Sequence, residues 1–150
     1  MKILKIRKSD KEQVYRLVLE ANEFYKKVTS FLIYVLNMNK KNADKYCRDY
    51  FKKDHFLYGI YEEKRLVALL HGRIKHAPRG NVGYIENVIV SPSCQGKGYS
   101  KKLYLAFLRF LKAKKIKYCQ LDVLYQNKKA IEIYQKWGFK EDALAMTKRI

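Results

Sequence analysis

Residues 84–103 decide the fold of this chain, and they read YIENVIVSPSCQGKGYSKKL. The apolar segment 84–90 predicts a strand that ends before Pro92, because proline lacks a backbone donor for strand pairing. A turn with two glycines follows at 95–98. Beyond it, apolar side chains recur at helical spacing over about 99–114. The sequence therefore predicts a strand, a glycine turn and a helix in direct succession.

A turn of this kind can hold a phosphate group. Glycines let the backbone approach a ligand closely, and a helix N-terminus offers unpaired N–H groups with a partial positive charge. Lys97, Lys101 and Lys102 add formal charge nearby. The turn lacks the Gly-Lys-Ser/Thr of a P-loop and the spacing of a dinucleotide fingerprint. A tight turn without a ligand is the alternative interpretation.

Length and composition indicate one domain over residues 1–150, and its 48% apolar residues argue against disorder. The sequence has neither a signal peptide pattern nor an apolar run long enough to span a membrane, so we expect a cytoplasmic protein without membrane contact. Three cysteines and three histidines form no metal-binding spacing, so no metal is expected. Cys94 is expected to be the most exposed thiol.

The charge balance is strongly basic, with 33 Lys and Arg against 14 Asp and Glu and a net charge of +19. Such a field attracts nucleic acids, phosphorylated metabolites and acidic protein surfaces, and it repels polyamines. The lysines are spread along the chain, so a compositional bias of the genome explains the charge equally well.

The remaining pattern predicts a mixed α/β (α+β) fold, in which helices pack around a β-meander. Ser9 and Glu12 resemble a capping box that begins a helix over 10–26, and Asn42 and Asn127 are candidate caps of two later helices. Residues 31–36 are interpreted as buried helix, with a strand as the alternative. Strands are expected at 2–7, 56–61, 65–74, 84–90 and 119–125, and one or two closing strands at 139–148.

Residues 90–103 closely resemble the acetyl-CoA signature of the GNAT N-acetyltransferase family. Gln95 and Gly98 match that signature, whereas Ser100 stands where glycine or alanine is usual. A second motif of the family follows at the expected separation and comprises Asn127, Ala130, Tyr134 and Gly138-Phe139. The strong resemblance covers residues 84–140, and the rest of the chain fits the family in the order of its elements.

The resemblance implies a mostly antiparallel sheet flanked by helices, in which strand 84–90 splays away from 118–125. The pantetheine arm of acetyl-CoA would lie in that gap, and an N–H near Val88 would polarise the thioester carbonyl. The implied cofactor residues are Val88, Ile89, Val90, Gln95, Gly96, Lys97, Gly98, Tyr99, Ser100, Asn127 and Tyr134.

Two catalytic candidates follow from the resemblance. Glu86 would act as general base, because partial burial favours the neutral carboxyl form and suits proton exchange near neutrality. It could instead bind the acceptor or form a salt bridge. Tyr134 would donate a proton to the departing CoA thiolate, and its alternative role is core packing. His71 and His76 are interpreted as surface residues of a strand.

The implied reaction is direct attack of a primary amine on acetyl-CoA. A small anionic metabolite or a protein amine is the favoured acceptor, and its pocket is expected from residues 22–56 and 76–83. A basic module that binds nucleic acid or ribosomes is the first alternative, and a non-catalytic acyl-CoA sensor is the second. A homodimer is also possible, as in many family members.

Overall fold

The computed structural model describes residues 2–28, 40–76, 78 and 80–144, so the expected apolar segment at 31–36 lies outside it. Apart from short 3-10 turns, the order of the described elements is one strand, two helices, three consecutive strands, a helix, a strand and a helix. The strands are β1 (Ile3–Lys5), β2 (Phe56–Glu62), β3 (Arg65–Lys75), β4 (Val82–Val90) and β5 (Cys119–Leu121). The helices are α1 (Lys11–Val28), α2 (Lys40–Cys47), α3 (Tyr99–Ala113) and α4 (Lys128–Lys136), with short 3-10 turns η1 (Lys8–Asp10), η2 (Arg48–Phe51) and η3 (Pro92–Cys94).

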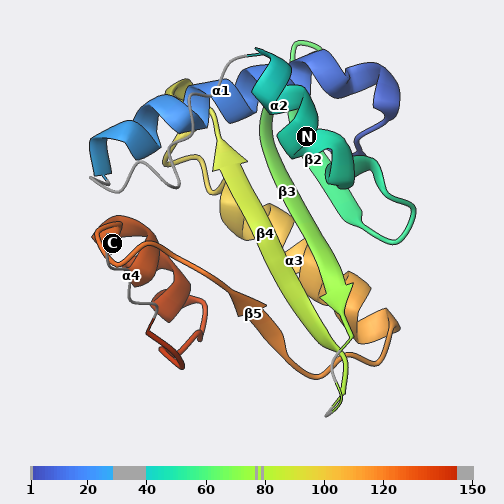
Figure 1. Ribbon diagram of the computed structural model, residues 1–150, viewed down its shortest axis with the longest axis vertical. Helices are drawn as coiled ribbons and strands as arrows, with labels where there is room; N and C mark the ends of the chain where they lie inside the picture. Colours follow the sequence, from blue (N-terminus) through green and yellow to red (C-terminus); the bar gives the residue numbers. More distant parts are fainter. Residues whose placement is uncertain (1, 29–39, 77, 79, 145–150) are drawn as a thin grey trace, which may run out of the picture.

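The five strands form one sheet in the order β1-β2-β3-β4-β5. The first three pairings are antiparallel, and β5 joins β4 in parallel. Figure 1 shows α1 and α2 on one face of the sheet and α3 on the other, with α4 beyond β5. This arrangement confirms the predicted mixed α/β class with a mostly antiparallel central sheet.

The two faces of the sheet bury separate apolar clusters. Leu17 of α1 packs with Leu69 and Ile89 on one face, and Phe107 of α3 lies in the cluster on the other. A side chain at Gly72 would lie 2.7 Å from the Phe107 ring, so this glycine allows α3 to approach the sheet closely. The close packing fixes α3, and with it the turn that precedes the helix.

A β-bulge in β4 is the feature that shapes the site. The register with β3 passes from His71 opposite Asn87 to Gly72 opposite Ile85, which leaves Glu86 as the extra residue. On the other edge, β5 ends at Leu121, opposite Ile85. The bulge and the end of parallel pairing therefore coincide, and from Glu86 onward β4 is paired with β3 alone.

The observed strand β5 is shorter than the predicted strand 119–125, because the chain leaves the sheet after Leu121. The divergence of β5 from β4 is visible in Figure 1, and it confirms the expected splay. Residues 139–144 contain no strand, so the prediction of closing strands is wrong over that range. The remainder of that prediction, residues 145–150, lies outside the described residues.

The helix caps agree with the sequence at one end of the chain and differ at the other. Asn127 accepts a hydrogen bond from the Ala130 amide at 3.3 Å, as expected of an N-cap. The predicted cap at Ser9 is wrong, since Asp10 instead accepts from the Arg7 amide at 3.0 Å and α1 begins one residue later. Asn42 lies inside α2 and does not cap it.

Candidate active site

The open edge of β4 presents backbone groups at alternate residues. The Ser91 amide donates to the Val67 carbonyl of β3 at 2.8 Å, which fixes the phase of pairing along the strand. Since alternate residues of a strand direct their N–H and C=O groups to opposite edges, Ile89 also bonds toward β3. Val88 and Val90 therefore direct their backbone groups to the edge that β5 leaves open.

The glycine turn lies at the C-terminal end of this edge. Gly96 and Gly98 have φ angles of 81° and 73°, in the left-handed region that side chains avoid. A side chain at either position would meet no atom within 4 Å, so the turn borders open space. Gly98 is the N-cap of α3, and the first amides of that helix lack partners within it. The turn therefore exposes the N-terminus of α3 to open space.

Glu62, at the end of β2, braces this turn from a distant part of the sequence. Its carboxylate accepts from the Lys97 ammonium at 3.0 Å, from the Tyr99 hydroxyl and from the Cys94 thiol at 3.5 Å. Tyr99 and Lys97 lower the pKa of Glu62 by these hydrogen bonds. The sequence did not identify Glu62, because the residue lies between two expected strands and no local pattern connects it to the glycine turn.

The exposure predicted for Cys94, which lies just before the glycine turn, is wrong. Cys94 is buried, with 4% of its surface exposed, and is therefore not the most exposed thiol. The 3-10 turn η3 folds it inward against the α3 cluster, where Glu62 and Lys97 contact its sulfur. Cys119 is more accessible, at an intermediate level, and burial raises the pKa of its thiol to about 12.

Helix α4 lies across the splay from β4 (Figure 1) and, with its cap, carries the last two predicted cofactor residues, Asn127 and Tyr134. Asn127 is half-buried, and its side-chain oxygen serves as the helix cap. The Tyr134 ring lies edge-on to Trp137, with ring centroids 5.5 Å apart, and edge-on to Phe139 at 5.9 Å. The Tyr134 ring therefore packs among neighbouring aromatic residues while the residue remains half-buried.

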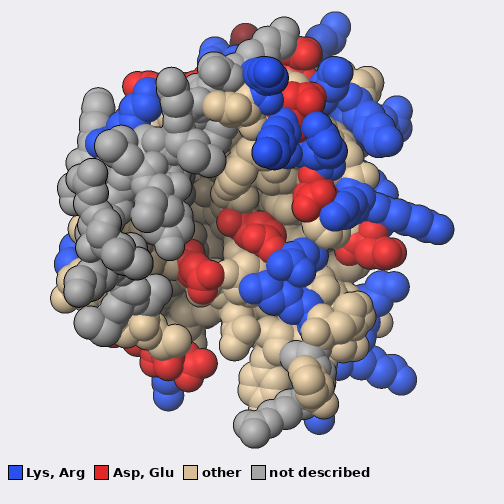
Figure 2. Space-filling model, in the orientation of Figure 1, with Lys and Arg blue, Asp and Glu red and all other residues tan. Residues whose placement is uncertain are grey.

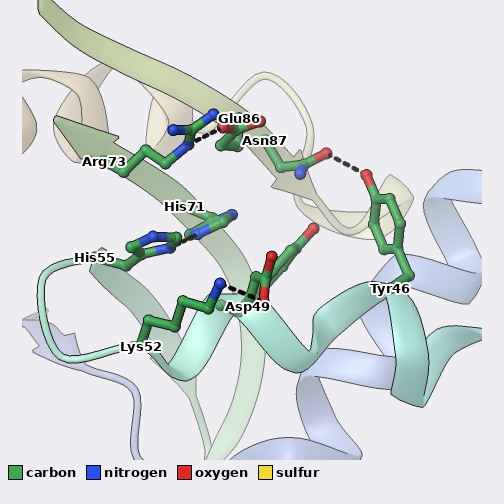
Figure 3. Close-up of a pocket in the computed structure, with 9 residues that line it drawn as sticks. Tyr46, Asp49, Lys52, His55, His71, Arg73, Glu86 and Asn87 are labelled. Carbon is green, nitrogen blue, oxygen red and sulfur yellow. Dashed lines mark hydrogen bonds and ion pairs between the residues drawn. The ribbon is translucent and has the colours of Figure 1, made fainter. Parts of the chain in front are cut away.

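A pocket of about 420 Å³ opens on the face that carries α1 and α2, beside the bulge of β4. Figure 3 shows side chains from α2, η2, the loop after η2, β3 and β4 converging on it. The lining residues are Tyr46, Asp49, Tyr50, Lys52, His55, His71, Arg73, Glu86 and Asn87. Those between 46 and 55 fall within the expected segment 22–56, whereas the other expected segment, 76–83, contributes no lining residue among those described.

The charges that line this pocket are paired. Glu86 accepts a hydrogen bond from the Arg73 guanidinium, and Asp49 pairs with Lys52 at 2.8 Å. Asn87 accepts from the Tyr46 hydroxyl at 3.2 Å. On the part of this face that Figure 2 draws in colour, Lys and Arg side chains project along the right-hand side. The pocket itself presents two cations and two carboxylates rather than a single sign of charge.

Two histidines in this pocket are in direct contact. His55 Nδ1 and His71 Nε2 lie 2.8 Å apart, and the His71 ring stacks on Tyr50 with centroids 4.0 Å apart. His71 is only 3% exposed, so its interpretation as a surface residue is wrong. Its side chain points to the face that η2 covers, and burial lowers its pKa to about 3. His76 is exposed and contacts Asn81 at 2.9 Å.

Other classes of site are not found in the described part of the chain. No group of three His, Cys, Asp or Glu side chains within it is arranged to bind a metal ion. None of the helices described is both long and apolar enough to cross a membrane.

A splayed pair of parallel strands beside a glycine turn and a capped helix defines the fold of the GNAT acetyltransferases. Residues 12–139 match the model of the Acetyltransferase (GNAT) family, and the chain belongs to this family. The resemblance carried by residues 84–140 is thereby confirmed. Members of this family use acetyl-CoA as the acetyl donor.

Among curated proteins, the chain is similar to a mycothiol acetyltransferase from Renibacterium salmoninarum. The two are 33% identical over 86 residues, which is 56% of this chain and 25% of that protein. A mycothiol acetyltransferase from Paenarthrobacter aurescens is 29% identical over 93 residues, 61% of this chain and 29% of the relative. The chain thus spans between a quarter and a third of the length of these relatives.

Solved structures share the whole fold at low identity. A tetramutant of the BH1408 protein from Bacillus halodurans has a TM-score of 0.83 at 18% identity and covers 100% of both chains. Glucosamine-6-phosphate N-acetyltransferase from Arabidopsis thaliana has a TM-score of 0.69 at 24% identity, covering 99% of this chain and 97% of that one. An aminoglycoside N-acetyltransferase in complex with CoA has a TM-score of 0.72 at 17% identity, covering 99% and 93%.

Proposed function

We propose that this protein transfers an acetyl group from acetyl-CoA to a primary amine by direct attack of the amine on the thioester. The observation that carries the proposal is the open edge of β4, where Val88 and Val90 direct backbone groups into the splay. This edge leads to a glycine turn that borders open space at the N-terminus of α3. One surface thus offers hydrogen bonds to a pantetheine amide and, further along, to a pyrophosphate.

The residues on the two sides of the splay have separate proposed roles in binding and in catalysis. The Val88 amide would donate to the thioester carbonyl oxygen, where negative charge develops, and one such donor typically lowers a barrier by about 2.7–4 kcal/mol. Asn127 would bind the pantetheine region with the part of its amide that does not cap α4. Tyr134 would donate its hydroxyl proton to the departing thiolate.

The pocket beside the bulge is the proposed acceptor site, and its paired charges suggest the acceptor class. Glu86 can bind an ammonium group or act as base, while Arg73 and Lys52 can bind an anionic group on the same molecule. We therefore favour a small amine that also carries a phosphate or carboxylate. A polycation would find too few unpaired carboxylates here, and the net charge of +19 would repel it.

An acetyl-transfer assay tests both the reaction and the acceptor class. Purified protein and acetyl-CoA are incubated with glucosamine 6-phosphate, an amino acid, an aminoglycoside, spermidine or a lysine peptide, and mass spectrometry detects acetylated product. We expect product from the anionic amines and little from the polycations. Acetylation of the polycations alone would contradict the proposed acceptor class, and no product from any amine would contradict the proposed reaction.

Arg73→Gln provides a sharper test of the anion contact. Its KM for an anionic amine should rise about tenfold, because one charge-assisted hydrogen bond is lost. Arg65→Gln is the matched control, since Arg65 lies at the start of β3 and pairs with Glu20, away from the pocket. Equal effects of the two substitutions would show that Arg73 does not contact the acceptor.

A further inference from the structure

The contact between His55 and His71 connects the inner end of the acceptor pocket to its outer side. His71 lies on β3 directly opposite Asn87, and the next pair along the register is Leu70 opposite Val88. His71 is therefore adjacent in the sheet to the amide proposed to hold the thioester. His71 is almost completely buried, whereas His55 is intermediate in exposure. The two rings therefore run along the wall of the proposed acceptor pocket, from a buried position on β3 to a more exposed position after η2.

The hydrogen bonds of the pair leave one ring nitrogen without a partner. His55 Nδ1 and His71 Nε2 share one hydrogen at 2.8 Å, so one nitrogen donates and the other accepts. His71 Nδ1 is buried and makes no hydrogen bond with any residue that the structure describes. If His71 Nε2 is the donor, Nδ1 is a buried acceptor without a partner among the described residues, in a side chain that lines the pocket, and the missing partner is an N–H group. An amine bound in the pocket would supply that group.

The charged side chains around the two histidines and the burial of the rings favour the neutral form of both. A positive charge that arises on one ring can pass to the other. Arg73 of β3 and Lys52, after η2, face the rings, and so do Asp49 of η2 and Glu86 of β4. Burial is the main cause that lowers the pKa of both histidines, and Arg73 lowers both further. His71 alone is therefore difficult to charge. Passing the charge outward to His55, which is less buried and close to both carboxylates, removes this difficulty.

We propose that the His55–His71 pair is the proton acceptor of the reaction, a role that rests on the proposed acetyl transfer. As the amine forms its bond to the acetyl carbon, its N–H bond breaks and the proton moves to His71 Nδ1. The hydrogen on His71 Nε2 moves at the same time to His55 Nδ1, so the positive charge rests on His55. After the product leaves, water in the pocket removes the proton from His71 Nδ1 and His55 returns its hydrogen. His71 is then the catalytic residue, and His55 carries the charge.

Kinetics of matched histidine variants test this role. His71→Gln should lower kcat about 100-fold, within the usual contribution of a general base, and should remove the fall in kcat/KM at acidic pH. His55→Gln should lower kcat about tenfold, because the charge can no longer move outward. His76→Gln is the control and should leave kcat and the pH profile unchanged, since His76 is exposed and lies outside the pocket.

The rise in melting temperature on addition of CoA is measured for each variant. A variant that is folded should show the wild-type rise, so loss of catalysis can be distinguished from loss of folding. A His71→Gln variant with wild-type kcat and an unchanged acidic limb would overturn the proposal while acetyl transfer still stands. If Glu86→Gln removes the acidic limb instead, the base is Glu86 and the proposal is also wrong.

Nitrogen-15 NMR of the histidine side chains tests the pair without any acceptor. We expect His71 protonated at Nε2 and bare at Nδ1 in the free protein near pH 7, with both rings responding to one titration step below pH 6.5. Protonation of His71 at Nδ1, or two independent titrations, would overturn the proposal. The tautomer and the shared titration can be measured even if the wild-type protein acetylates none of the amines offered, so failure of the proposed reaction and failure of the histidine pair are distinguishable.

Discussion

The two halves of the candidate site are built in different ways. The cofactor half comes from one continuous part of the chain, residues 84–138, and relies on backbone groups of β4, the glycine turn and the start of α3. The acceptor half relies on side chains from α2, η2, β3 and β4, which meet at the bulge of Glu86. Backbone geometry leaves short motifs in a sequence, whereas a pocket assembled by tertiary packing leaves none. Substitutions in the two halves should therefore have different effects: some should change cofactor binding, some the rate of acetyl transfer and some acceptor binding.

The largest expected effect is on chemistry at the cofactor half. Tyr134→Phe should lower kcat about 100-fold or more, because the thiolate loses its proton donor, while CoA binding stays unchanged. Stopped-flow measurement of transfer, together with a thermal shift by CoA, checks both parts. Tyr125→Phe is the control, since Tyr125 lies just before α4 and is 66% exposed. Unchanged turnover in Tyr134→Phe would assign Tyr134 to packing against Trp137 and Phe139 alone.

The second effect concerns binding by the glycine turn. Gly98→Val should weaken acetyl-CoA binding at least tenfold, because it fills the space beyond the turn and forces a side chain into the left-handed region. The backbone strain alone costs about 1–2 kcal/mol of stability. Gly80→Val is the matched control, because Gly80 also has a positive φ and open surroundings but lies in the turn before β4. Calorimetric titration should show weaker binding only in Gly98→Val.

The third effect is on the pH dependence of folding at the acceptor half. The pKa of His71 is about 3 in the folded protein, against 6.5 for an unperturbed histidine. Between these pH values the unfolded chain binds the extra proton, so the free energy of unfolding falls as the pH falls, by up to about 1.4 kcal/mol per pH unit. Urea unfolding at pH 7, 6 and 5 should show a smaller decline in His71→Gln than in wild type. A decline in His71→Gln equal to that of His76→Gln would contradict the burial of a neutral His71.

The smallest expected effect concerns Glu62, which holds the glycine turn in place. Glu62→Gln keeps a hydrogen-bond acceptor but loses the charge that holds Lys97, so KM for acetyl-CoA should change about threefold, with kcat unaffected. Glu63→Gln removes the same charge from the exposed neighbouring residue and should change neither constant. A change in kcat without a change in KM would show that Glu62 acts beyond the turn.

The fold and the local backbone of the proposed cofactor half were largely predictable from the sequence. Pro92, the glycines of the turn and the Asn127 cap each act on their own local backbone, so their effects can be inferred without tertiary contacts. The splay was predicted from the resemblance to the family. Its place at Glu86 depends on a bulge that arises from register with β3, and no local pattern specifies it.

The acceptor half was predictable only in part. Glu86 was identified, but its ion pair with Arg73 needs two strands in register, 13 residues apart in sequence. The burial of His71 depends on η2 placing Tyr50 over its ring, and a strand histidine two residues before an arginine gives no sign of that in the sequence. Cys94 was misjudged for the same reason, because the turn that follows β4 folds its thiol onto Glu62.

The most direct test of the account is a thermal shift series with acetyl-CoA, desulfo-CoA and a short RNA at two salt concentrations. A ligand at 100 times its Kd adds about 2.7 kcal/mol of stability. We predict a shift with both CoA ligands that persists at the higher salt, because the pantetheine arm binds the open edge of β4. No shift with either CoA ligand, together with a salt-sensitive shift with RNA, would contradict the acetyltransferase account and favour a nucleic-acid-binding module.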